Sequence, residues 1–155
     1  MRLRDTRVVA WLHMMRVSSK MERLSSEHIR ILGMTSAQFD VLAQLSTHEG
    51  ISQQALSEIL FVTKGNVCGL IGRMEQRDLV ERRPDPDDRR ANLLFLTEKG
   101  KALAQRVMPE QERFIAEQMS ALSQDEEATF RTLLRQLDRS LPGNPAQADP
   151  QSDYI

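Results

Sequence analysis

The side chains best suited to chemistry in this chain are two pairs of arginines, Arg82-Arg83 and Arg89-Arg90. They flank a run of loop-forming residues, Pro-Asp-Pro-Asp-Asp at 84–88, which predicts the turn of a hairpin. An arginine at the tip of a hairpin can enter the minor groove of DNA, where negative potential is concentrated. The alternative is a hairpin whose arginines form only surface ion pairs, which contribute little energy.

The charge around these arginines is balanced, and so is the charge of the whole chain. Four acids cancel the four arginines of the hairpin: Glu81, Asp85, Asp87 and Asp88. The full chain of 155 residues carries a formal charge of −1. Such a balance argues against a protein that coats nucleic acid by bulk attraction. Any contact with DNA must therefore depend on the placement of individual side chains.

A short amphipathic helix, predicted from Lys64 to about Arg77, comes directly before the hairpin. Its inward residues are Val67, Leu70, Ile71 and Met74. The opposite face offers candidate DNA contacts: Thr63, Lys64, Gly65, Asn66, Cys68, Gly69 and Arg73. Asn can pair with adenine through two hydrogen bonds, and Lys can reach guanine or phosphate in the major groove. The alternative for this face is a solvated helix surface.

Three glycines in the same helix, Gly65, Gly69 and Gly72, need an explanation. Each costs a helix interior roughly 0.5–1 kcal/mol relative to alanine. They allow either a close approach of the backbone to DNA or tight packing between helices. The pattern favours packing for Gly72 and offers no firm account of Gly69.

The elements that must position these residues are mainly helical, because apolar residues recur at helical spacing and aromatic residues make up only 5%. Capping-box spacing at Thr35–Gln38 and at Ser123–Glu126 marks two helix starts. The predicted elements, in chain order, are helices at about 6–32, from 35 to before 50, at 52–60 and 63–77, strands at 79–83 and 92–96, and helices at 97–119 and 123–141.

Three compact helices followed by a hairpin predict a winged helix-turn-helix, in a fold that is mainly α with a small β-hairpin. We expect four parts: an N-terminal dimerisation helix at 1–32, the winged unit at 33–100, C-terminal dimerisation helices at 101–141, and a disordered tail at 142–155. The apolar stripes of the terminal helices exceed what the small central unit can cover. They therefore predict a homodimer with one self-complementary interface.

Three motifs carry a resemblance to a known family. They are Met34-Thr35-x-x-Gln38-Phe39-x-Val41-Leu42, Gln54-x-Leu56-Ser57-x-x-Leu60 and Asp88-x-Arg90-x-x-x-Leu94-x-Leu96-Thr97-x-x-Gly100. With them, residues 33–100 resemble the MarR family of bacterial transcriptional regulators. The resemblance implies a repressor that binds a pseudo-palindromic, double-stranded DNA operator as a homodimer, with Arg90 inserted into the minor groove and Asp88 holding it.

The same resemblance implies release from DNA by a small aromatic or anionic effector. Trp11, Met15 and Arg16 in the first helix could form its site, with an apolar wall and a cation for a carboxylate. A methionine-rich helical stripe is more often the core of a dimer, and that interpretation is favoured here.

Other functional classes find little support. No nucleophile elbow or phosphate-binding loop points to an enzyme, and three scattered histidines predict neither a metal site nor a cofactor. The single cysteine, Cys68, fits a reducing cytoplasm, and no apolar run is long enough to span a membrane. Two alternatives stay open: a winged-helix module that binds proteins rather than DNA, and a redox-responsive regulator acting through Cys68.

Overall fold

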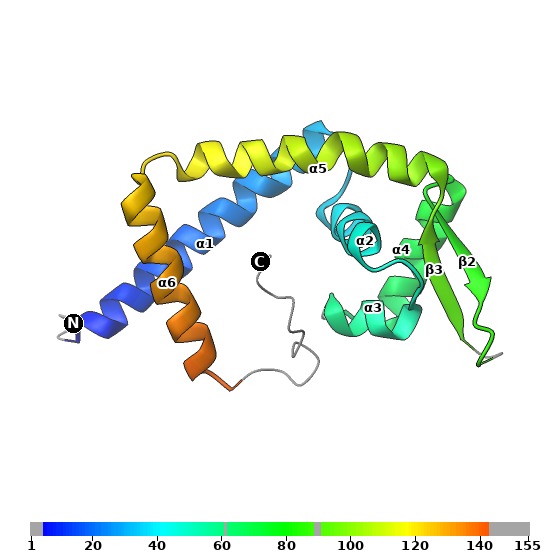
Figure 1. Cartoon of the computed structure of the whole chain (residues 1–155), viewed down its shortest axis with the longest axis horizontal. Coiled ribbons are helices and arrows are strands. Elements are labelled where there is room, and N and C mark those ends of the chain that lie inside the picture. The colour runs from blue at the N-terminus through cyan, green and yellow to red at the C-terminus, as the bar shows by residue number, and fades with distance from the viewer. Residues whose placement is uncertain (1–4, 61, 89–90, 143–155) are drawn as a thin grey trace.

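A computed structural model describes residues 5–60, 62–88 and 91–142. Its elements are α1 (Thr6–Ile31), α2 (Ser36–Thr47), β1 (Ile51–Ser52), α3 (Gln53–Ile59), α4 (Lys64–Gln76), β2 (Val80–Pro84), β3 (Asn92–Leu96), α5 (Glu98–Met119) and α6 (Gln124–Ser140). Helix α5 runs along one side of the molecule, from the sheet at one end to α6 at the other (Figure 1). The tail predicted to be disordered lies, beyond Pro142, outside the described residues.

The helix boundaries follow from local chemistry that the sequence already carries. Both predicted capping boxes are confirmed, at Thr35 with Gln38 and at Ser123 with Glu126. Helix α1 ends because Gly33 adopts a φ of +84°, a conformation open to glycine at little cost. The next amide, that of Met34, donates to the carbonyl of Ile29 and closes the helix end.

The sheet has three antiparallel strands in the order β1-β3-β2, and the sequence predicted only two. Ile51 in β1 pairs with Leu94, and the amide of Gly50 donates to the Leu94 carbonyl at 2.8 Å. Strand β1 has only two residues, so it is too short to show the alternation by which strands are found. It closes the edge of β3 that the predicted hairpin left open.

A continuous apolar core joins α2, α3, α4, the sheet and the first half of α5. We call α2, α3, α4 and the three strands the winged unit. Core residues with no exposed surface include Val41, Leu42, Leu45, Leu56, Val67, Ile71, Met74, Leu94 and Val107. Among the described residues, no single helix is long and apolar enough to cross a membrane; only α3 and α4 taken together as a bent pair meet that composition.

The start of α5 is fixed to the turn between α4 and β2. The Thr97 hydroxyl donates to the Asp78 carbonyl at 2.6 Å, and the Lys99 ammonium donates to the Arg77 carbonyl at 2.7 Å. A Cβ added at Gly100 would lie 2.0 Å from the carbonyl oxygen of Leu79, so only glycine fits. The Thr-x-x-Gly motif therefore joins α5 to the winged unit.

Helix α1 is joined to α5 by a partly buried polar cluster. His28 Nδ1 lies 2.7 Å from the Gln111 side-chain oxygen, and the Gln111 amide donates to the Ser25 hydroxyl at 2.7 Å. The His28 ring stacks on Phe114 with centroids 4.2 Å apart. Gln111 is only 3% exposed, so its hydrogen bonds compensate for the burial of a polar side chain.

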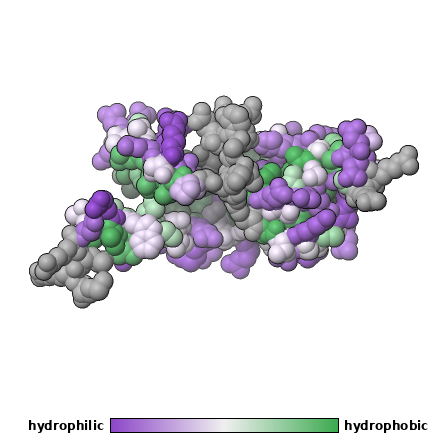
Figure 2. All heavy atoms as spheres, turned by 90° about the horizontal axis from the view of Figure 1, so that it is seen from below, coloured by the Kyte–Doolittle hydropathy of each residue, from purple (hydrophilic) through white to green (hydrophobic). Residues whose placement is uncertain are grey.

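The last helix differs from all the others because none of its residues is buried. Its large apolar side chains lie on one face and are 39% to 58% exposed: Phe130, Leu133, Leu134, Leu137 and, just beyond the helix, Leu141. The first half of α1 also exposes Val8, Trp11, Leu12 and Met15. At this end of the molecule, hydrophobic patches lie among hydrophilic ones (Figure 2). We call α6 and residues 6–17 the terminal arm.

Candidate nucleic-acid interface

Helix α4 presents one solvent-facing side beside the sheet, as the sequence predicted. The four inward residues are buried, and Thr63 caps the helix by accepting from the amide of Asn66 at 3.3 Å. All the candidate contact residues are exposed: Thr63, Lys64, Gly65, Asn66, Cys68, Gly69 and Arg73. The apolar spacing therefore orients the helix, and its polar residues are left at the surface of the winged unit.

The three glycines of α4 do not pack against another helix. A Cβ at Gly65 or at Gly72 would meet no atom within 4 Å, so the packing interpretation of Gly72 is wrong. At Gly69 the nearest atom is the guanidinium Nη1 of Arg73, 3.5 Å from the Cβ position. Helical spacing places all three glycines opposite the buried residues. The centre of the outward face thus has no side chains, and Arg73 lies across it at Gly69.

The wing, residues 80–96, is a tight hairpin between β2 and β3. The Asp85 amide donates to the Ala91 carbonyl at 3.1 Å, and the Ala91 amide donates to the Asp88 carbonyl at 2.9 Å. The Asp85 carboxylate accepts from the amides of Asp87 and Asp88. Arg89 and Arg90 lie outside the described residues, and in sequence they fall between Asp88 and Ala91. Asp88 itself is exposed.

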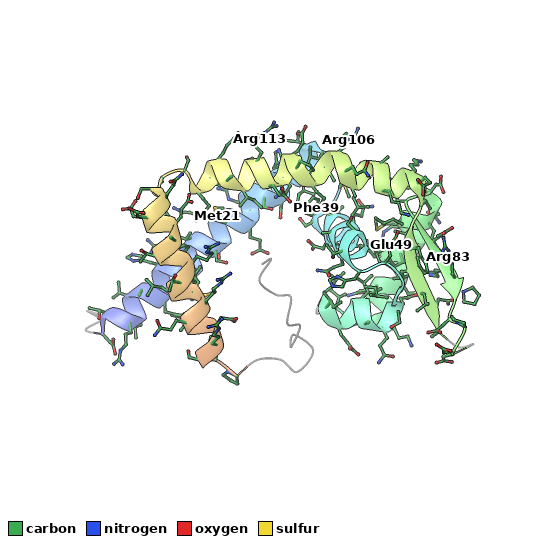
Figure 3. All side chains as sticks on the ribbon, viewed as in Figure 1. Met21, Phe39, Glu49, Arg83, Arg106 and Arg113 are labelled. Carbon is green, nitrogen blue, oxygen red and sulfur yellow. The ribbon has the colours of Figure 1, made fainter. Side chains whose placement is uncertain are left out.

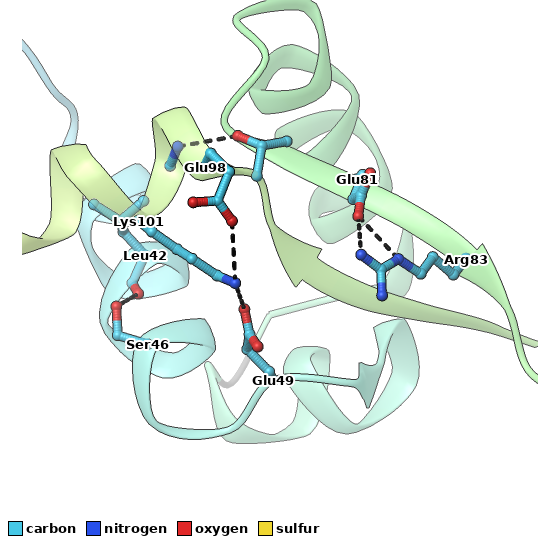
Figure 4. A network of polar contacts seen from close by, with 9 residues as sticks. Leu42, Ser46, Glu49, Glu81, Arg83, Glu98 and Lys101 are labelled. Atoms are coloured by element: carbon cyan, nitrogen blue, oxygen red, sulfur yellow. Dashed lines mark hydrogen bonds and ion pairs between the residues drawn. The ribbon is translucent and has the colours of Figure 1, made fainter.

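The other two arginines of the wing contact neighbouring groups of the chain itself. The Arg83 guanidinium pairs with Glu81 (Figure 4). It also lies over the Phe95 ring, with its Cζ 4.2 Å from the ring centroid. Arg82 reaches α4, where it pairs with Glu75 at 3.0 Å. Sequence reasoning singled out Arg90 among the four arginines and missed the link from Arg82 to α4, because a contact between a strand and a preceding helix leaves no short-range pattern.

A shallow hollow lies between α3, the start of α4 and the wing. Its lining is Ser52, Gln53, Gln54, Ala55, Glu58, Lys64, Asp85, Asp88, Ala91 and Asn92. The lining is mostly polar: its amides, hydroxyl and single ammonium can donate to phosphate oxygens, whereas its three carboxylates, Glu58, Asp85 and Asp88, cannot. The hollow thus separates two projecting features, the outward face of α4 and the tip of the wing.

Three cations of α5 do not extend this surface. Arg106 and Arg113 project from the side of α5 that faces away from the winged unit (Figure 3). Lys101 bridges Glu49 at 3.3 Å and Glu98 at 3.6 Å (Figure 4). The hydrogen bond with Glu49 raises the pKa of the Lys101 ammonium. Lys101 is therefore held in an ion-pair cluster on the other side of the sheet.

The candidate effector residues lie in the first half of α1, which belongs to the terminal arm. Trp11 and Met15 are 54% and 45% exposed, and Arg16 is exposed as well. Trp11 and Met15 share one helix face with Val8 and Leu12, because the four residues follow helical spacing. Among the described residues, no group of three or more histidines, cysteines and acids is arranged to hold a metal ion.

Comparison with known proteins identifies the family. A MarR family model matches residues 32–91. An HTH-type transcriptional regulator of Bacillus cereus is 32% identical over 72% of this chain and 76% of its own length. The chain belongs to the MarR family. The repressor NicR of Pseudomonas putida is 34% identical, over 67% of this chain and 66% of its own length.

A solved structure extends the MarR likeness to the whole fold. A mutant of E. coli MarR in complex with operator DNA superposes with a TM-score of 0.75 and 28% identity, covering 92% of this chain and all of that one. The likeness therefore includes the terminal helices as well as the winged unit. The fold expectation of a winged helix-turn-helix between long terminal helices is confirmed.

Proposed function

We propose that this MarR-family chain represses transcription by binding a pseudo-palindromic operator as a homodimer. The observation that carries the proposal is the outward face of α4, with Lys64, Asn66 and Arg73 exposed beside a tight wing. A helix of this kind enters the major groove, and the wing then reaches the adjacent minor groove. The E. coli relative solved with operator DNA supports this mode of binding.

The bare centre of the α4 face supports a close approach of the helix backbone to the bases. Gly65 and Gly72 have open space where other residues carry side chains, and Gly69 has the Arg73 guanidinium beside it. In this arrangement Asn66 pairs with adenine, and Arg73, lying across Gly69, supplies a guanidinium for guanine or phosphate. In the wing, Arg90 inserts into the minor groove and Asp88 orients it. The roles of Arg90 and Asp88 are inferred from the family motif.

The terminal arm supports dimerisation by a second copy of the same chain. Amphipathic α6 has no buried residue, although its four large apolar side chains and Leu141 just beyond it share one face. Exposed apolar patches of this kind mark interfaces, and a twofold axis lets one patch cover itself. Two winged units held by one interface can then occupy successive major grooves.

Release of the operator requires an effector that prefers a dimer unable to fit DNA, since a ligand with equal affinity for both states shifts nothing. Trp11, Met15 and Arg16 are the candidate site for an aromatic acid. Their shared face with Val8 and Leu12 favours the dimer interface as their main role. A thermal-shift screen with aromatic acids tests the effector role separately.

The experiment for the proposed function is a fluorescence anisotropy titration of the full chain against DNA from upstream of its own gene. We expect tight binding that weakens steeply with salt, because neutralised phosphates release counterions. Unrelated DNA of equal length is the control. Binding that is absent, or independent of both sequence and salt, would favour a protein-interaction module instead. A Cys68→Ser variant that loses only its response to peroxide would favour the redox alternative.

A further inference from the structure

Arg82 is part of the wing, and its side chain extends toward α4. Its Nη1 lies 3.0 Å from the Glu75 carboxylate near the end of α4, and its Nη2 donates to the Cys68 carbonyl at 3.3 Å in the middle of that helix. The two acceptors are seven residues apart, almost two helical turns. One guanidinium on the neighbouring strand therefore contacts both a backbone carbonyl and a side chain of α4.

Stability alone does not account for this arginine. Its Nε is buried and has no hydrogen-bond partner among the described residues, which is a costly arrangement. The side chains of Arg82 and Glu75 are 27% and 30% exposed, and an ion pair buried to this degree adds little net stability. What the contacts do supply is a fixed geometry between a helix and a strand.

We propose that Arg82 is a positioning residue, which holds the wing at one offset from α4 so that both fit their grooves at once. The proposal rests on the proposed function, since the offset matters only if both parts touch DNA. The hairpin extends beyond the sheet at its tip, and a wing free to swing would lose conformational freedom on binding. Holding it in place before binding avoids that loss.

Neutralising Glu75 gives a test of sign. Electrostatics alone predicts that Glu75→Gln tightens binding, because it removes a negative charge near DNA. The positioning role predicts the opposite, weaker binding by roughly fivefold to tenfold, in the range of coupling between contacting residues. Glu58→Gln on α3, beside the same surface, is the matched control and should bind as tightly as wild type or more tightly.

A second variant separates geometry from charge. Arg82→Lys keeps the cation but cannot reach two acceptors with one planar group, so it should weaken binding as Glu75→Gln does. If Glu75→Gln acts through the wing, it should add little in an Arg90→Ala background, where the wing contact is already lost. Tighter binding by Glu75→Gln, or full additivity with Arg90→Ala, would overturn the proposal.

A measurement without DNA distinguishes a failure of this proposal from a failure of the proposed function. Spin labels on Gln76→Cys and Asn92→Cys, in a Cys68→Ser background, report the distance between α4 and the wing by double electron–electron resonance. Glu75→Gln and Arg82→Lys should broaden this distance distribution while thermal unfolding shows that both variants are folded. An unchanged width overturns the positioning role. If the distance distribution broadens in both variants but the wild-type protein binds no DNA, the positioning role of Arg82 is supported and only the proposed function is overturned.

Discussion

The winged unit and the terminal arm show how differently two parts of one chain can use apolar residues. In the winged unit, Val41, Leu42 and Ile71 have no exposed surface. In the arm, α6 has no buried residue, although Leu133 and Leu137 are as apolar as anything in the core. The winged unit completes its core within one chain. The arm has apolar residues at the spacing of a core, but no other part of the described chain covers them. For this reason we propose that a second copy of the chain packs against the arm.

The largest expected effect tests the completeness of the winged unit. Gly100→Ala should destabilise the chain by about 3 kcal/mol, because the new Cβ would overlap the backbone oxygen of Leu79. A backbone atom cannot move aside as the end of a flexible side chain can. Urea denaturation measures the loss. Gly72→Ala is the matched control, since the same substitution there meets no atom within 4 Å. Equal midpoints for the two variants would contradict the close contact.

The next effect tests the arm. Leu134→Asp with Leu137→Asp should yield a monomer in light scattering, because two charges would enter the apolar interface. DNA affinity should fall by about a hundredfold or more, since the second half-site no longer benefits from tethering to the first. Thr132→Asp, on the opposite face of α6 by helical spacing, is the control. A dimer that survives the double substitution would place the interface elsewhere.

A smaller effect separates the arginines of the wing. Arg90→Ala should weaken operator binding by more than about tenfold, a cost of about 1.4 kcal/mol, and leave thermal stability nearly unchanged. Arg83→Ala should change binding much less, because that guanidinium already pairs with Glu81 and stacks on Phe95. Gel-shift titrations of the two variants measure the difference. Equal losses would remove the reason for singling out Arg90.

The smallest expected effect is a substitution in α4 that should raise stability and weaken DNA binding. Gly72→Ala should stabilise the chain by about 0.5–1 kcal/mol, because alanine is the better helix former and the site has open space. It should also weaken DNA binding by roughly twofold to fivefold, equivalent to less than about 1 kcal/mol, if the backbone approaches the groove there. A variant that is more stable and binds equally well would show that the bare face has no role in binding.

Most of the fold could be predicted from short-range patterns. Capping residues such as Thr35, Thr63 and Ser123 and the apolar spacing of α4 act over a few residues, and the structure has each helix start where they predicted. Strand β1 could not be predicted, because it exists only through pairing with β3, more than forty residues later in the chain. The need for glycine at position 100 likewise depends on the backbone of Leu79.

The candidate site divides in the same way. Which residues of α4 face outward follows from helical spacing, and the sequence predicted it. What surrounds them does not, so packing was wrongly expected at Gly72, and Arg73 was not expected to lie across Gly69. The link from Arg82 to Glu75 was missed because its partners belong to different elements. Residue type alone cannot tell a guanidinium that faces DNA from one held inside the protein.

The attachment of α5 to the winged unit has a consequence for which operators the protein can bind. Thr97, Lys99 and Gly100 fasten its first turn to the winged unit, and α6 follows its far end. Its 22 residues make a rod about 33 Å long. In a dimer joined through the arm, the length of this helix would set the distance between the two winged units. One helical turn inserted near Met119 would lengthen it and change which spacing of half-sites fits, with every base-contacting residue unchanged.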